Sequence, residues 1–405
     1  MSAHGAPGRH ASTHPATTVE EHAKHVASLL TVDLAVETVP LDDALHRVTA
    51  HAVTSPVDLP LFRNSQMDGF AVRSADVTHA PVTLPIVGEV AAAASSPGEL
   101  APATAVRIMT GAVVPAGADA IVPVEDTSST AATVTIARGR SAGEFVRERG
   151  SDVHAGDELL PAGLRLESRH LAALAAAGIT SVDVTERVHI AVITTGSELV
   201  APGSDPLLGQ VFDSNGTALT AAAHALGATV VYRAHVNDDT SAMLGALTDA
   251  AASAHLILTS GGISMGDYEV VRESLEPLGA QVGHVAMQPG GPQATAVFEG
   301  VPVICFPGNP VSTQLSFEVF VAPVLRVLAG LPQARRELRA LATDTTSVAG
   351  KRQFLRGRFT ETGVELVAGS SSHLVAALAA SDCLVVVPEN TTTLAAGDLV
   401  QTWAL

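Results

Sequence analysis

The segment VHIAVITTG at residues 188–196 begins the part of the sequence that decides the fold. It is a near-continuous apolar run that ends at a glycine, and the amphipathic stretch NGTALTAAAHALG at 215–227 follows it. The apolar runs ATVVYRAHV at 228–236 and HLILTSGG at 255–262 repeat this pattern. Apolar strands that alternate with amphipathic helices indicate a sheet of the parallel type with helices on both faces. We therefore expect a three-layer α/β domain over residues 187–331.

The sequence on both sides of this domain has a different texture. Residues 18–55 and 150–186 carry helical patterns and are expected to form one discontinuous helical domain. Short apolar runs broken by Pro and Gly predict two small β-domains, at 56–149 and at 332–405. Residues 1–17 lack the apolar region of a signal peptide and read as a disordered leader. The fold class is therefore a multidomain α/β plus β chain.

The composition limits the classes of partner that this chain can bind. It has 23 basic and 41 acidic residues and a net charge of −18. This charge argues against nucleic acid and anionic membranes as partners, and no apolar run of about 18 residues free of charges or breakers suggests a membrane span. Cys305 and Cys383 lie in apolar runs, which predicts buried free thiols and a cytoplasmic protein.

Residues suited to ligand binding follow four of the expected strands. In an open α/β sheet, ligands bind beyond the carboxyl ends of the strands. Glycines let backbone N–H groups approach an anion there, and a following helix adds its positive N-terminus. Carboxylates at the same edge suit a hard cation such as Mg²⁺. The residues are Gly196, Ser197 and Glu198; Asp238 and Asp239; Gly261, Gly262, Ser264, Asp267 and Glu269; and Pro307, Gly308, Asn309, Pro310 and Ser312.

Each of these motifs also has a purely structural interpretation. Asp238 or Asp239 can be the N-cap of the helix that follows Thr240, and Glu198 can be a surface acid. TSGG can be a tight turn, and the polar cluster in NSQMDGFAV can be an Asx-type turn. Several motifs converge on one edge of the sheet, however, and this convergence favours a site for a phosphate or oxyanion together with a cation.

Seven motifs occur along the chain in the order NSQMDGFAV, RIMTGAVVPAGADAIVPVE, RGSDV, TTGSELV, FDSNG, SGGISMGDY and PGNPVS. In this order they resemble the molybdopterin molybdotransferase family of the MoeA type, which includes the E domain of gephyrin. The resemblance extends from about residue 18 to near the end of the chain. It implies an elongated four-domain homodimer, with a dimerising discontinuous domain at 18–55 and 150–186 and a β-barrel at 332–405. The α/β domain of this homodimer would bind the pterin nucleotide. The implied reaction inserts molybdate into adenylylated molybdopterin, with Mg²⁺ as the cation, and yields molybdenum cofactor and AMP.

The resemblance also implies roles for individual residues. Those in catalysis are Asp68, Thr110, Asp152, Glu198 and Asp238, and those that hold the metal are Glu198, Asp238 and Glu269. Those in substrate binding are Gly196, Ser197, Asp213, Asn215, Ser260, Gly261, Gly262, Ser264, Pro307, Gly308, Asn309, Pro310, Ser312, Arg356 and Ser372. Within this last set, Ser312, Arg356 and Ser372 would hold molybdate.

The loop MQPGGPQ at residues 287–293 departs from the family's pattern. Many relatives carry KPGKP there, whereas this chain has Gln288 and Gly291 in place of the two lysines. We expect no other lysine beside the loop, and we expect Gly291 to need a positive φ. The lost charge favours a rival function, a non-catalytic carrier or insertion paralogue that binds molybdopterin or the cofactor. A dimeric scaffold is a weaker rival, because a scaffold does not need Asp68, Glu198, Asp238 and Ser312 together. The expected partners beyond the substrates are other molybdenum cofactor biosynthesis proteins and molybdoenzyme apoproteins.

Overall fold

The computed structural model describes residues 16–94, 96–263 and 269–405. Contacts between residues divide the chain into two compact units, Val36–Thr185 and a larger unit of Met1–Ala35 with Glu186–Leu405. The predicted leader lies outside the described residues except for its last two, of which Thr17 forms a bridge to Val285. The predicted division into four domains remains a prediction.

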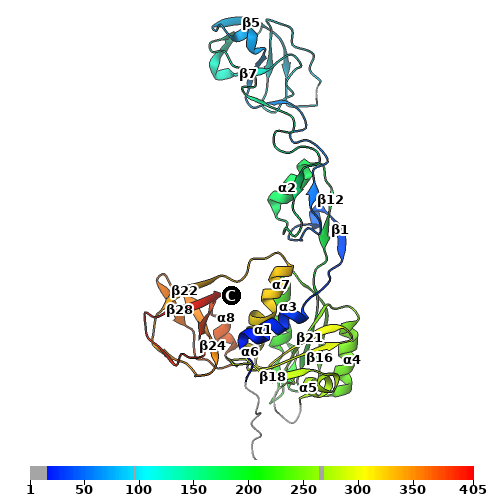
Figure 1. Cartoon of the computed structure of the whole chain (residues 1–405), viewed down its shortest axis with the longest axis vertical. Coiled ribbons are helices and arrows are strands. Elements are labelled where there is room, and N and C mark those ends of the chain that lie inside the picture. The colour runs from blue at the N-terminus through cyan, green and yellow to red at the C-terminus, as the bar shows by residue number, and fades with distance from the viewer. Residues whose placement is uncertain (1–15, 95, 264–268) are drawn as a thin grey trace, which may run out of the picture. The chain divides into compact units, whose positions relative to one another are not determined.

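A six-stranded sheet forms the centre of the larger unit (Figure 1). Its strands, in spatial order, are β16 (Thr229–Val236), β13 (His189–Thr195), β17 (Leu256–Ser260), β21 (Val301–Phe306), β20 (Pro292–Phe298) and β18 (Gln281–His284). The first four run parallel to one another. The last two pair antiparallel, so the sheet is mixed at this edge and not parallel throughout.

Helices cover both faces of this sheet, because alternate side chains along each strand enter different cores. Ile190 and Val192 of β13 pack with α3 (Ser214–Ala225) and with the helix that follows β21. Ala191 and Ile193 of the same strand pack with α4 (Thr240–Ala251) and α5 (Val270–Leu275). The three-layer α/β arrangement predicted from the strand–helix rhythm is therefore present.

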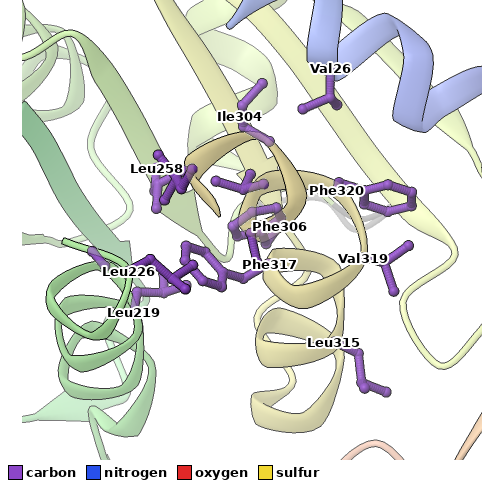
Figure 2. Packing of buried hydrophobic residues seen from close by; sticks show 14 of the residues in the cluster. Val26, Leu219, Leu226, Leu258, Ile304, Phe306, Leu315, Phe317, Val319 and Phe320 are labelled. Atoms are coloured by element: carbon purple, nitrogen blue, oxygen red, sulfur yellow. The ribbon is translucent and has the colours of Figure 1, made fainter. Parts of the chain in front are cut away.

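The helix after β21 is continuous from Pro310 to Leu328 and consists of α6 (Pro310–Ser316), the π-helical η5 (Phe317–Val321) and α7 (Ala322–Leu328). Figure 2 shows Phe317 and Phe320 of this helix among the buried side chains of the core. Val26 of α1 (Val19–Leu29) belongs to the same cluster. By length and composition alone the helix could cross a membrane, but 61% of it is buried inside the protein. Its apolar character is that of a core helix.

The C-terminal part of the larger unit contains a closed ring of five strands. The ring runs β24 (Arg352–Phe359), β25 (Gly363–Leu366), β22 (Arg336–Leu341), β28 (Leu399–Ala404) and β26 (Cys383–Val387), and β26 pairs again with β24. The short β19 (Met287–Gln288) joins the outside of β24. The remaining elements of the larger unit are β14 (Leu199–Val200), β15 (Val211–Phe212), η4 (Glu276–Leu278), β23 (Thr345–Thr346), α8 (Val375–Ala379) and β27 (Thr393–Leu394).

The two cysteines lie in buried strands of this unit. Cys305 belongs to β21 and Cys383 to β26, and both are free and buried, as the sequence predicted. Burial raises the pKa of each thiol to about 12. Because the thiolate is the reactive form, both behave as small apolar core residues.

The second unit is built mainly from strands. Its six-stranded sheet has the order β7 (Ala120–Pro123), β4 (Gly69–Val72), β6 (Ala105–Ile108), β5 (Val82–Val90), β9 (Thr133–Ile136) and β8 (Thr127–Ser129). Three further strand pairs are β1 (Val36–Pro40) with β12 (Ser181–Thr185), β2 (Val53–Thr54) with β11 (Glu158–Leu160), and β3 (Asn64–Ser65) with β10 (Val146–Arg147). Its helices are α2 (Ser168–Ala176) and the short η1 (Leu41–Asp43), η2 (Ser74–Val77) and η3 (Val124–Asp126).

The helical character predicted for residues 18–55 is therefore wrong beyond the first helix. The segment at 36–40 reads VETVP, whose alternating pattern is typical of a strand, and it pairs with β12 over its full length. The segment LDDALHRV supplies only the 3₁₀ turn η1. In addition, α1 belongs to the larger unit, because its apolar face packs in the core of the α/β sheet.

Candidate functional site

A cleft of about 790 Å³ lies at the carboxyl ends of β13 and β17 and beside the loop that follows β21. It lies entirely within the larger unit. Its lining residues are Thr195, Gly196, Glu198, Leu199, Val211, Phe212, Asp213, Ser214, Asn215, Asp238, Ser260, Gly261, Gly262, Glu269, Gly308, Asn309, Pro310, His373 and Val375. Twelve of these are among the residues to which the sequence assigned a site role. The strand-end position predicted for the site is therefore where the cleft is found.

Glycines allow the loops at this edge to approach one another closely. Gly308 after β21 lies against Gly261 after β17, and a Cβ on Gly308 would meet the Cα of Gly261 at 3.3 Å. At Gly261 the φ is +97°, and a Cβ would meet the carbonyl oxygen of Thr195 at 2.7 Å. Gly196 has a φ of +142°, and the carboxylate of Glu198 folds back over its Cα. Side chains at Gly261 or Gly308 would force the strand ends apart, whereas one at Gly196 would displace the Glu198 carboxylate.

Buried hydrogen bonds tie the strand ends together beneath the cleft. The Nδ2 group of Asn215 donates to Ser260 Oγ at 2.9 Å and to the Gly308 carbonyl at 2.7 Å. The hydroxyl of Thr313, on α6, lies 3.1 Å from Ser260 Oγ and donates to the Pro307 carbonyl at 2.6 Å. This network gives the PGNPVS segment a structural role. Its Gly308 carbonyl accepts from α3 and its Pro307 carbonyl accepts from α6, and both donors also contact Ser260 of β17.

Two buried polar atoms of the lining residues have no hydrogen-bond partner within the described ranges. They are Oδ1 of Asn215 and Oγ1 of Thr195. A buried acceptor without a partner costs about 1–3 kcal/mol. A ligand that donates a hydrogen bond to Asn215 would remove this penalty.

The two consecutive aspartates after β16 have different environments. Asp239 is the N-cap of α4 and accepts from the Ala242 N–H at 2.7 Å. Asp238 lines the cleft, and its Oδ2 accepts from the N–H of Ser197 at 3.1 Å and from its hydroxyl at 2.7 Å. The helix-cap interpretation therefore holds for Asp239 and not for Asp238.

The three predicted metal ligands, Glu198, Asp238 and Glu269, all line the cleft. Carboxylate oxygens are the donors that Mg²⁺ takes in proteins, so the chemistry of this set fits the cation. Elsewhere in the described ranges, a different group has its possible ligand atoms within 4.8 Å of one another. It consists of Glu186, His189 and His255, none of which lines the cleft. The rings of these two histidines are stacked with planes only 4° apart, so their in-plane lone pairs cannot converge on one ion.

Asp213 is occupied by structural contacts. Its Oδ1 accepts from the Gly216 N–H at 2.9 Å as the N-cap of α3, and its Oδ2 accepts from Thr194 Oγ1 at 3.0 Å. Arg233 lies 3.7 Å from Oδ2. Asp213 lines the cleft, but these contacts fix the start of α3 and already use both of its oxygens.

Five of the predicted substrate-binding residues are not part of the cleft lining: Ser197, Pro307, Ser312, Arg356 and Ser372. Arg356 is only 1% exposed and donates to the carbonyls of Gly369 and Ser371, and desolvation lowers its pKa. The Ser372 carbonyl accepts from the Val311 N–H at 3.0 Å, which takes up one of the free N–H groups at the start of α6. The predicted Ser264 lies outside the described residues, as does Asp267.

Asp68, Thr110 and Asp152 lie in the second unit. Oδ1 of Asp68 accepts from the N–H of Thr110 at 2.6 Å and from its hydroxyl at 2.7 Å. These hydrogen bonds, the backbone one first, lower the pKa of Asp68. The sequence therefore selected two residues that are in direct contact, and both are exposed.

The loop at 287–293 differs from its sequence-based description in two respects. Gly291 does not have a positive φ; Gly290 does, at +102°. A side chain at 291 is instead opposed by the imidazole of His284, which lies over its Cα. A lysine is also present nearby, because Lys351 precedes β24, whose Arg352 N–H donates to the Ala286 carbonyl at 2.8 Å.

Sequence reasoning missed several residues of the site. Thr195, Leu199, Val211, Phe212, Ser214, His373 and Val375 line the cleft, and Thr313 supports it. Thr195, Phe212 and Thr313 lie inside or directly after motifs that the sequence had singled out. His373 and Val375 come from a distant segment near α8, and their position depends on how that segment packs.

A glycine-lined, acid-bearing cleft at the carboxyl edge of an α/β sheet places the chain among α/β proteins that bind small anionic ligands. Family models match three regions: the MoeA N-terminal region (domain I and II) at residues 17–178, a probable molybdopterin binding domain at 191–327, and the MoeA C-terminal region (domain IV) at 339–405.

Similar proteins cover nearly the whole chain. Molybdopterin molybdenumtransferase 2 of Mycobacterium tuberculosis is 41% identical over 403 residues, which are 96% of this chain and 99% of that protein. The molybdopterin molybdenumtransferase of Synechococcus elongatus is 36% identical over 94% of this chain and 97% of its own length. The crystal structure of the molybdopterin biosynthesis MoeA protein from Pyrococcus horikosii superposes with a TM-score of 0.84 at 30% identity, covering 96% and 99% of the two chains. This chain belongs to the molybdopterin molybdenumtransferase (MoeA) family, as its seven ordered motifs indicated.

Proposed function

We propose that this protein is a molybdopterin molybdotransferase, which inserts molybdate into adenylylated molybdopterin and releases AMP. Membership of the family supports the reaction class. The structural observation that supports it best is the cleft, whose floor carries the unpartnered Asn215 Oδ1 and whose rim carries Glu198 and Asp238. A volume of about 790 Å³ is in the range of pockets that bind ligands of this size.

The residues of the cleft suggest how each part of the substrate is held. The glycine-rich ends of β17 and β21 leave room for phosphate oxygens beside backbone N–H groups. Asn215 accepts a hydrogen bond from the substrate, and Ser197 holds the carboxylate of Asp238 in place. Mg²⁺ held by Glu198, Asp238 and Glu269 would neutralise the phosphoanhydride's charge. Arg356, Ser312 and Ser372 would bind molybdate, and Asp68, Thr110 and Asp152 would assist catalysis.

We further propose that the enzyme is a cytoplasmic homodimer that acts with other molybdenum cofactor biosynthesis proteins and molybdoenzyme apoproteins. The free thiols of Cys305 and Cys383 support a reducing compartment. Sedimentation of the purified chain tests the dimer, and a monomer at micromolar concentration would contradict it.

A non-catalytic carrier or insertion paralogue is the alternative. The observation that favours it is the loop at 287–293, where Gln288 Oε1 accepts from Gln353 Nε2 at 2.6 Å and neither Gln288 nor Gly291 carries a charge. Incubation with adenylylated molybdopterin, molybdate and Mg²⁺ separates the two functions. The enzyme releases AMP in repeated turnovers, whereas a carrier binds the substrate and releases none.

A further inference from the structure

Phe212 is an exposed aromatic residue in the wall of the cleft. Five of the ten phenylalanines, Phe70, Phe306, Phe317, Phe320 and Phe354, are at most 1% exposed. Phe212, by contrast, is 45% exposed and lines the cleft. A phenyl ring left partly in water forgoes part of the burial of apolar surface that stabilises a folded protein. The exposed ring therefore provides a surface on which a ligand can gain this burial.

The backbone on both sides of Phe212 is fixed by hydrogen bonds. The Val211 N–H donates to the Glu198 carbonyl at 2.9 Å, and the Asp213 N–H donates to the Val200 carbonyl at 2.8 Å. β15 (Val211–Phe212) thus pairs parallel with β14 (Leu199–Val200), and Asp213 then caps α3. These contacts fix the backbone that carries the ring before a ligand arrives, which reduces the ordering cost of binding.

The other groups of the cleft indicate what kind of ligand meets this ring. Phe212 is the only Phe, Tyr or Trp among the described lining residues, and most of the others are polar, charged or glycine. Asn215 also lines the cleft, and its Oδ1 is buried and lacks a donor among the residues described. Planar nitrogen heterocycles stack on aromatic side chains, and their exocyclic amino groups donate hydrogen bonds.

We propose that Phe212 binds the substrate by stacking on a planar, amino-substituted nitrogen heterocycle in the cleft. This inference rests on the proposed function for the identity of the substrate, which carries two such rings, a pterin and an adenine. Phe212 is then a substrate-binding residue that contributes affinity and orientation, and it takes no part in proton or group transfer.

The test uses AMP and neopterin as probes of the two rings, with equilibrium binding measured by calorimetry. Phe212→Ala should weaken the binding of at least one probe at least about fivefold, the lower limit for loss of a stacking contact. Phe212→Leu, which keeps an apolar side chain but loses the flat face, should also weaken it. Leu208→Ala is the matched control, because Leu208 is fully exposed nearby and does not line the cleft. Its affinities should equal those of the wild type.

Phe212→Trp gives a second readout that does not depend on activity. The chain has one tryptophan, Trp403, which lies in the C-terminal ring of strands. A tryptophan at 212 should therefore add fluorescence that the stacking probe quenches, with little change in the wild type. Equal affinities of the wild type and Phe212→Ala for both probes would overturn the proposal, and so would undetectable binding of both probes to the wild type.

The failure of this inference is distinguishable from that of the proposed function. If wild type releases AMP from adenylylated molybdopterin and Phe212→Ala has an unchanged KM, the function stands and the stacking does not. If no AMP is released but probe binding still depends on Phe212, the stacking stands and the reaction does not.

Discussion

Ser197 holds Asp238 through two hydrogen bonds, because its backbone N–H and its hydroxyl both donate to Oδ2 of the aspartate. The contact joins the end of β13 to the end of β16 at the rim of the cleft. Asp239, the next residue, caps α4 instead. Two adjacent acids of the same type therefore serve different purposes, and substitution can separate them.

Asp238→Ala should impair the reaction without loss of stability, and Asp239→Ala should do the reverse. Asp238 is exposed at the cleft, so its removal should raise the Mg²⁺ concentration needed for AMP release at least about tenfold. Removal of the Asp239 cap should cost about 1 kcal/mol of folding free energy and leave the Mg²⁺ requirement unchanged. Mg²⁺ titrations and thermal melts of both variants check this, and equal Mg²⁺ requirements would contradict the assignment of Asp238.

Loss of the Thr313 hydroxyl should lower both the stability of the protein and the affinity of the cleft for AMP. Thr313→Val keeps the shape of the side chain but leaves the Pro307 carbonyl without its buried donor, which should cost about 1–3 kcal/mol. AMP affinity should fall as well, because Ser260 and Gly308 lose part of the network that positions them. Thr313→Ser keeps the hydroxyl and should behave like wild type in melting and calorimetry. A larger loss in Thr313→Ser than in Thr313→Val would show that methyl packing, and not the hydroxyl, matters.

His22 should make the protein less stable in acid. Burial against Phe320 lowers the pKa of His22 to about 4, whereas the unfolded side chain has a pKa near 6.5. Between these values the unfolded chain binds a proton that the folded chain does not, so stability falls as pH decreases from about 6.5 to about 4. The slope is at most about 1.4 kcal/mol per pH unit.

The measurement is the change in melting temperature between pH 7 and pH 5. His22→Phe keeps an aromatic ring beside Phe320 and removes the titrating group, so its change should be smaller than that of wild type. The same substitution at the exposed His79 should leave the wild-type change intact. An identical change in all three proteins would mean that His22 does not control acid stability.

Gln288→Lys should lower the molybdate concentration needed for half-maximal AMP release. A charge-assisted contact to the dianion is worth about 1.5–3 kcal/mol, which corresponds to roughly tenfold or more in affinity. Gln401→Lys adds the same charge at an exposed position of β28 and should have no effect. An unchanged half-saturation point in folded Gln288→Lys would show that position 288, which pairs with Gln353, does not face the anion.

The α/β sheet and the edge at which the cleft lies could be predicted from local sequence patterns alone. The run at 188–196 is apolar on both faces because both faces of β13 are covered, and periodicity of this kind depends only on local order along the chain. Glycines and acids at strand ends carry their signal in the same local way, which is why twelve predicted residues line the cleft.

Tertiary structure decided what the local pattern could not specify. Whether Asp238 or Asp239 caps α4 depends on where Ser197 lies, 41 residues earlier. The amphipathic pattern of α1 does not specify which core its apolar face will enter. Packing against Phe320 and its neighbours places α1 in the larger unit. His284 over Gly291, and Phe212 in the wall of the cleft, are likewise consequences of long-range packing. A sequence pattern states that a side chain is apolar or polar, and only the folded chain determines which distant atoms it meets.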